Sequence, residues 1–192
     1  MSDRSYEALP TADLVESLKS THRLERMAAS HELRARAEKD ASELVQYAQD
    51  MNRALSSVEA QTRWELLAAL SAVAAVDIKA VARTFREAEA SLFDDESSAV
   101  RLAAFRFFVV FGANNEKNSD KAWPLIDEFI QCYHGDPEYR DILTQLVCFA
   151  KGNLSQKTKK SFTDRLSFDA ESAHGYIKTF SVEIIEILKR AQ

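Results

Sequence analysis

The sequence predicts an all-α protein, an α-solenoid of about four antiparallel helix pairs with capping helices at its ends. Three observations predict this fold. Glycine and proline are scarce, with four and three in 192 residues, and before residue 111 only Pro10 is of either type. Apolar residues recur at helical spacing along almost the whole chain. A pair of predicted helices also recurs at a nearly constant interval, as in helical-repeat proteins.

Ten helices are expected, in the order 11–19, 21–37, 40–55, 58–75, 77–93, 96–111, 120–134, 137–151, 156–167 and 170–190. The best start signal is Asp136-Pro137-Glu138, with a capping side chain, proline at the first helical position and an acid near the helix dipole. Gly112, Gly135 and Gly152 are expected to end helices. The polar residues 112–119 are expected to form the one long loop.

The repeat is visible in four arginines, each early in a predicted helix: Arg23, Arg63, Arg101 and Arg140. Their separations are 40, 38 and 39 residues. We therefore expect a single domain spanning 1–192, closed by a C-terminal capping helix at 170–190. Its units are expected at about 20–56, 57–94, 95–135 and 136–168. Helix 96–111 is apolar nearly all round, as a middle helix flanked by neighbours would be.

Two segments resemble the HEAT repeat, whose first helix commonly begins with an acidic turn, then Val-Arg and small residues. The better match is residues 95–104, Asp-Glu-Ser-Ser-Ala-Val-Arg-Leu-Ala-Ala, and the second is residues 136–140. In that family an Asp and an Arg at these positions link neighbouring repeats. The resemblance therefore implies a structural inter-repeat role for Asp95, Arg101, Asp136 and Arg140.

The charge balance limits the class of partner. The chain has 25 basic and 30 acidic residues, a formal net charge of −5, which argues against a generic nucleic-acid or membrane-surface protein. No apolar stretch is long enough to span a bilayer, and the N-terminus lacks the apolar region of a signal peptide. Cys132 and Cys148 are interpreted as small core residues of a reduced protein. We therefore expect a cytoplasmic protein.

No combination of residues indicates catalysis. The four histidines are too scattered for a metal-ligand pattern, and no two glycines are close enough for a phosphate-binding loop. Pairs such as Asp127-Glu128 are more simply helix-surface carboxylates. We expect no catalytic, metal or cofactor site, and no enzyme.

Partners of a helical solenoid usually bind the concave surface made by the second helix of each pair. Once the core positions are removed, polar and aromatic residues of these helices remain as candidates for binding another protein. They are Tyr47, Asp50, Arg53, Lys79, Arg83, Arg86, Trp123, Asp127, Lys159 and Lys160. Tyr47 and Trp123 are of the type enriched at interfaces, although each could equally cover a neighbouring repeat.

These observations favour a non-catalytic scaffold or adaptor that binds an unidentified protein, as a monomer or weak homodimer. The alternative is a nucleic-acid-binding protein related to helical-repeat glycosylases for alkylated bases, in which Trp64 and Trp123 could stack on a base. The basic residues within 151–165 are either a phosphate or acidic-partner contact or an ordinary solvated surface. A third possibility is an adaptor that self-associates through its last helix, where Val182 and Ile187 lie outside the core stripe.

Overall fold

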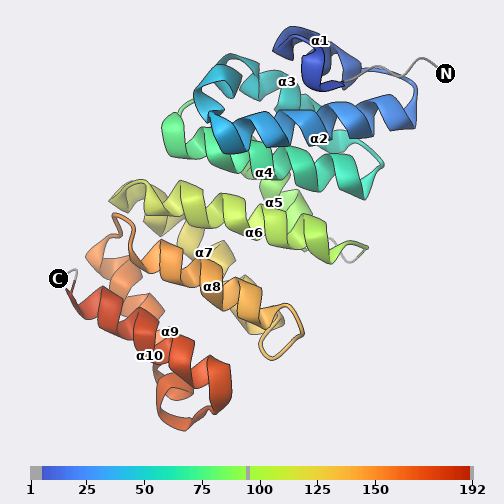
Figure 1. Cartoon of the computed structure of the whole chain (residues 1–192). Coiled ribbons are helices and arrows are strands. Elements are labelled where there is room, and N and C mark those ends of the chain that lie inside the picture. The colour runs from blue at the N-terminus through green and yellow to red at the C-terminus, as the bar shows by residue number, and fades with distance from the viewer. Residues whose placement is uncertain (1–5, 94–95, 191–192) are drawn as a thin grey trace. The chain divides into compact units, whose positions relative to one another are not determined.

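The computed structural model describes residues 6–93 and 96–190, and within these ranges every regular element is helical (Figure 1). The predicted all-α class is therefore confirmed. Internal contacts divide the chain into two compact units, residues 1–107 and 108–192. The division into four repeats stays a prediction. Over the described ranges, no helix is both long and apolar enough to cross a membrane.

The first unit contains a layer of long helices and a layer of shorter ones. Its elements are the 3₁₀ helix η1 (Tyr6–Ala8), α1 (Thr11–Ser17), α2 (Arg23–Lys39), η2 (Ala41–Tyr47), α3 (Ala48–Arg53), η3 (Ala54–Ser56), α4 (Ala60–Val76), α5 (Thr84–Leu92) and the first part of α6 (Ser98–Ala113). Helices α2 and α4 lie side by side, and η2, α3 and η3 pack against α4 (Figure 1).

The predicted helix 40–55 is instead a short α-helix between two 3₁₀ helices. Its first turn is tightened by Asp40, whose Oδ1 accepts hydrogen bonds from the backbone N–H of Ser42 at 2.9 Å and from its hydroxyl at 2.6 Å. The apolar residues that recur at helical spacing here are nevertheless mostly buried: Leu44, Ala48, Met51 and Leu55 are in the core and Val45 is half-buried. Packing of this stripe, not regular α-helical geometry, holds the segment in place.

The predicted helix 77–93 begins only at Thr84. Before it, the chain winds through successive turns closed by bonds between residues three apart, such as Ala80 N–H to Asp77 O at 3.2 Å. The carboxylate of Asp77 also accepts from the Lys79 N–H at 2.9 Å, which favours a tight turn over an α-helical start. Helical spacing over this segment predicts a buried stripe, and Val81, Ala88 and Leu92 are buried. Ile78 and Phe85 are only half-buried and Ala82 is exposed, because the turns before Thr84 do not follow α-helical periodicity.

The second unit contains the end of α6, then α7 (Glu116–Cys132), α8 (Tyr139–Ala150), α9 (Gln156–Ser172) and α10 (Gly175–Arg190). Helix α7 packs against α9, and α8 packs against α10 (Figure 1). The helix expected as a C-terminal cap therefore lies beside α8. In α6, the predicted burial is confirmed for four of its phenylalanines, Phe105, Phe107, Phe108 and Phe111.

The predicted loop 112–119 is wrong. Helix α6 continues to Ala113, and α7 begins at Glu116 because the side chain of Asn115 accepts a hydrogen bond from the Asn118 N–H at 3.0 Å. Gly112 is inside α6, where an added Cβ would lie 2.8 Å from Cε2 of Phe149. Glycine at this position lets the Phe149 ring pack closely against α6, and it does not end the helix.

Two other glycines have different physical roles. Gly135 has φ +83°, the left-handed conformation expected just beyond a helix end. Gly152 lies against Ala113, where an added Cβ would be 2.5 Å from that residue's Cβ and 2.8 Å from its carbonyl oxygen. The adjacent Asn153 N–H donates to the same carbonyl at 2.8 Å. The main chain of the turn after α8 thus packs directly against the main chain at the end of α6.

Candidate functional site

The first unit carries a cationic surface, defined here as Lys79, Arg83 and Arg86. All three side chains are exposed, on the opposite side from the buried Val81 and Thr84. Arg83 and Arg86 are three residues apart at the start of α5 and share one helix face, and Lys79 lies in the turns just before them. Within the described residues, no carboxylate pairs with any of the three.

The short helix α3 lies next to this surface. The amide Nε2 of Gln49 donates to the carbonyl of Ala80 at 3.2 Å, which joins α3 to the turns before α5. Asp50 and Arg53 lie on the same helix and pair with each other at 2.7 Å. The predicted Tyr47 is half-buried at the junction of η2 and α3. Six of the predicted binding residues thus lie in this one unit, three on or beside α3 and three on the cationic surface. The Gln49–Ala80 hydrogen bond joins these two groups.

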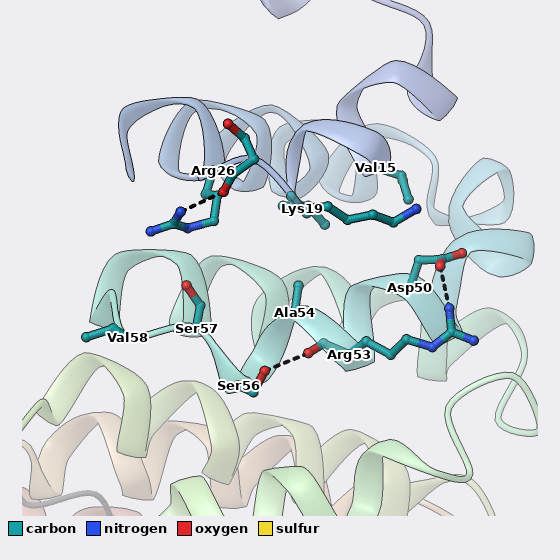
Figure 2. A pocket seen from close by; sticks show the side chains of 11 residues that line it. Val15, Lys19, Arg26, Asp50, Arg53, Ala54, Ser56, Ser57 and Val58 are labelled. Atoms are coloured by element: carbon teal, nitrogen blue, oxygen red, sulfur yellow. Dashed lines mark hydrogen bonds and ion pairs between the residues drawn. The ribbon is translucent and has the colours of Figure 1, made fainter. Parts of the chain in front are cut away.

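A groove of about 450 Å³ lies on the other side of α3 (Figure 2). Val15, Lys19 and Arg26 line one side of it, and the segment that includes Asp50, Arg53 and Val58 lines the other. Its basic groups are neutralised, because Arg26 binds the carboxylate of Glu59, Lys19 pairs with Glu16 at 2.6 Å and Arg53 pairs with Asp50. The hydrogen bond to Glu16 also raises the pKa of Lys19. The groove is therefore a mixed apolar surface with no unpaired charge to attract a particular ligand.

Trp123 and Lys159 were predicted to point outward, and this is wrong, because both are buried in the second unit. The indole N–H of Trp123 donates to the Ser161 hydroxyl at 2.8 Å, and its ring packs against Phe149 and Phe162 with centroids 6.2 and 4.9 Å away. This tryptophan covers a neighbouring repeat and has no face free to stack on a base.

The other two candidates of the second unit differ from each other. Asp127 is bound by Arg165, whose Nη2 lies 2.9 Å from Oδ2. Lys160 is exposed, as predicted. Trp123 and Lys159 are therefore withdrawn from the proposed binding surface, Asp127 is occupied by an internal partner, and Lys160 stays a candidate.

Of the four predicted inter-repeat residues, the structure shows a contact between helices for Arg140, and the Asp–Arg links stay a prediction. Asp95 lies outside the described residues, and Arg101 is half-buried in α6. Asp136 is exposed before α8. Arg140 does connect two helices, but through an aromatic ring: its guanidinium carbon lies 5.8 Å from the ring centroid of Tyr176 on α10.

Within each unit, other side chains provide polar links between helices that are not consecutive in the chain. In the second unit four pairs join α7 and the residues around it to α9: Asp120–Ser155, Trp123–Ser161, Asp127–Arg165 and His134–Asp169. The two members of each pair are 35 or 38 residues apart. The separations of 38 match the predicted period of 38–40 residues, and those of 35 are slightly shorter. We call this set the α7–α9 ladder.

In the first unit the corresponding links join α2 to α4 and its start. Arg26 binds Glu59, and Arg34 binds the buried Glu65, which also contacts His31 at 3.1 Å. The charges of α2 are therefore largely used inside the unit. In the sequence, a buried ion pair is indicated only by Glu65, which lies between Trp64 and Leu66 in an apolar helix.

Cys132 and Cys148 are both exposed, so their interpretation as core residues is wrong. The apolar neighbours that suggested burial, such as Ile130, lie on a different face of the helix from the thiol. Over the described ranges, no group of three or more His, Cys, Asp or Glu residues is placed to hold a metal ion.

No protein-family model matches the chain, and no curated protein sequence matches it. Solved structures do match. A designed armadillo repeat protein in complex with the peptide (KR)4 has a TM-score of 0.74 and 14% identity, with 93% of this chain and 81% of that chain covered. Computationally designed armadillo repeat proteins for modular peptide recognition give 0.71 and 15%, with coverage of 92% and 81%. A further engineered protein gives 0.73 and 16%, with coverage of 94% and 79%. The chain therefore has the fold of helical-repeat solenoid proteins.

Proposed function

We propose that this chain is a non-catalytic, HEAT-like binding scaffold that holds an acidic segment of another protein on the cationic surface. The observation that carries this proposal is the exposure of Lys79, Arg83 and Arg86 without a carboxylate partner. Other cations of the first unit already pair with carboxylates, including Arg26, Arg34 and Arg53.

The physical basis is the sum of several weak contacts on a firm support. An isolated exposed ion pair contributes little, but three cations at fixed spacing steer an acidic segment and add their contributions. The support is firm because Val81, Thr84 and Ala88 on the opposite side are buried. Glu87 and Glu89 lie on the same helix. We therefore expect the acidic residues of the partner to be spaced so that they contact the cations and stay away from these two glutamates.

The comparison with designed repeat proteins supports the mode of binding, not the partner. One of those proteins is described with the basic peptide (KR)4 and others with modular peptide recognition. The unpaired groups on the cationic surface are positive, so they need a ligand of the opposite charge to (KR)4. We therefore expect this chain to prefer acidic peptides to basic ones.

The test is fluorescence anisotropy with a labelled glutamate-rich peptide, at low salt and at increasing salt. We expect saturable binding that weakens as salt rises, and a loss of several-fold in affinity for Arg83→Ala and for Arg86→Ala. Arg106→Ala is the matched control, because Arg106 is an exposed arginine on α6, outside the cationic surface. This control variant should bind like the parent chain.

Three outcomes would overturn the proposal. The first is that the glutamate-rich peptide does not bind at low salt, and the second is that Arg83→Ala and Arg106→Ala have equal effects. The third is that duplex DNA binds more tightly than the peptide and with a steeper salt dependence, which would favour the nucleic-acid function instead.

A further inference from the structure

The second unit contains a small pocket between α7 and α9. It has a volume of about 310 Å³ and is lined by Ile130, Gln131, His134, Arg165, Phe168 and Asp169. This volume is at the lower end of the range for ligand pockets, about 300–1,000 Å³. We propose that it binds the guanidinium group of an arginine side chain presented by another protein. The proposal concerns a different unit and the opposite charge from the cationic surface, so it stands independently of the proposed function.

The first argument is the balance of charge. The Asp169 side chain is buried, with the whole residue 6% exposed. Among the described residues its hydrogen-bond partner is His134, whose Nε2 lies 3.2 and 3.0 Å from the two carboxylate oxygens. Arg165, one turn earlier on α9, turns to Asp127 instead and places Nη2 2.9 Å from its Oδ2. The guanidinium of Arg165 is therefore engaged by Asp127, and Asp169 accepts no guanidinium hydrogen bond among the described residues.

A buried carboxylate is stable only when donors or cations compensate for its lost hydration. His134 offers the carboxylate a single ring nitrogen, so Asp169 retains unfilled acceptor positions. The chemical group that fits is a cation with several N–H donors. A second carboxylate or a phosphate would be repelled.

The second argument is an unpaired hydroxyl beside the pocket. Tyr139 is fully buried, and its hydroxyl has no hydrogen-bond partner in the described part of the chain. Its ring centroid lies 4.8 Å from that of His134, a residue of the pocket wall. Burial and the charge of Asp169 both raise the pKa of Tyr139, so the hydroxyl stays neutral. Because this hydroxyl has no hydrogen-bond partner, it donates nothing to Asp169, and the carboxylate depends on His134 alone among the described residues.

The third argument is the aromatic residue at the pocket. Phe168 lies next to Asp169 and is 75% exposed, although large apolar side chains are mostly buried elsewhere in the chain. An aromatic face attracts a planar cation laid against it. Guanidinium can stack on a ring and give two parallel hydrogen bonds to a carboxylate at the same time, whereas an ammonium group cannot. The combination of Asp169 and Phe168 therefore favours arginine over lysine.

The experiment uses the full chain and three matched probes: the N-acetyl methylamides of arginine, lysine and citrulline. Citrulline has the shape of arginine without its charge. Binding is followed by amide chemical shifts in two-dimensional NMR. We expect saturable binding of the arginine probe, with shifts near His134 and Asp169, and weaker or no binding of the other two.

Variants then locate the site. Asp169→Asn should weaken binding by about tenfold or more, because it removes the charge that the guanidinium meets. Asp164→Asn removes the same charge from an exposed position of α9 and should leave binding unchanged. Phe168→Ala should weaken binding several-fold while keeping the helical circular dichroism of the parent, since this side chain is exposed.

The proposal fails if the arginine probe shows no saturable shifts, or if citrulline or lysine binds as tightly. It also fails if Asp169→Asn and Asp164→Asn have equal effects. Where Asp169→Asn loses helical signal, Phe168→Ala decides the matter: unchanged affinity in that folded variant would overturn the assignment.

Discussion

Arg26 on α2 binds both carboxylate oxygens of Glu59, the residue immediately before α4. Its Nε lies 3.2 Å from Oε2, and its Nη2 contacts Oε1. The Ser57 hydroxyl donates to the same carboxylate. These hydrogen bonds, above all those from Arg26, lower the pKa of Glu59 from 4.5 to about 2. The entry to α4 is thus fixed by a charge on the preceding long helix.

This pair makes stability depend on acid pH. Because the folded pKa of Glu59 is depressed, its contribution is fully present above about pH 4.5 and is lost as the pH falls toward about 2. Glu59→Gln should lower the urea midpoint at pH 7 and have a smaller effect near pH 3. Glu89→Gln, at an exposed position of α5, is the control and should have little effect at either pH. An equal loss for Glu59→Gln at both pH values would contradict the role of its charge.

Gly152 and Gly135 should differ in their tolerance of alanine. An added Cβ at Gly152 would lie 2.5 to 2.8 Å from Ala113, including its backbone, so Gly152→Ala should cost about 2–3 kcal/mol of unfolding free energy. At Gly135 no atom lies within 4 Å, and only the φ of +83° opposes a side chain, at a cost of about 1 kcal/mol. Urea unfolding followed by circular dichroism measures both. The reverse order would show that close packing at Gly152 is not limiting.

Removal of the Ser161 hydroxyl tests the burial of Trp123. Ser161→Ala leaves the indole N–H without its 2.8 Å acceptor and should cost about 1–2 kcal/mol. Ser167→Ala, on the same helix, removes a hydroxyl that bonds only to the Thr163 carbonyl within α9, and should be close to neutral. Both variants can be compared by urea unfolding monitored by tryptophan emission. Equal stability of the two would mean that the indole has another partner or reaches water.

The exposed thiols give a chemical test of the structure. Cys132 and Cys148 are both exposed, so both should react with a thiol reagent such as DTNB in the native protein. The reaction should need no denaturant, and Cys132→Ser should remove one of the two equivalents. A thiol that reacts only after unfolding would place that cysteine in the core and restore the interpretation from the sequence.

The parts of the fold that the sequence predicted are those encoded by local periodicity. The stripes that bury Leu66 and Val73 in α4, or Ile142 and Leu146 in α8, depend on spacing within one helix. The 38–40-residue interval between arginines anticipated the stacking of like helices. One of these four arginines, Arg140, contacts the neighbouring helix α10. Its partner is a tyrosine ring, which the spacing could not identify.

The errors concern interactions between distant residues. Trp123 looked outward because its position lies off the main apolar stripe, but Phe149, Phe162 and Ser161 from later helices cover it. Gly112 looked like a helix end because glycine usually is one, whereas here Phe149 requires the missing Cβ. In both cases the deciding atoms are supplied by residues 26 or more positions away. A single sequence without the fold does not identify such neighbours.

The α7–α9 ladder determines how this chain can tolerate changes in length. All four of its links bypass α8, which contributes no member to them. Residues gained or lost between Gly135 and Glu138, before α8, would therefore leave every donor opposite its acceptor, whereas the turn after α8 is held against Ala113 at Gly152. A single insertion within α9, between Ser155 and Ser161, would rotate the later partners by about 100° and break their pairing together. We expect natural variants of this protein to vary in the turn before α8 and to keep the length of α9.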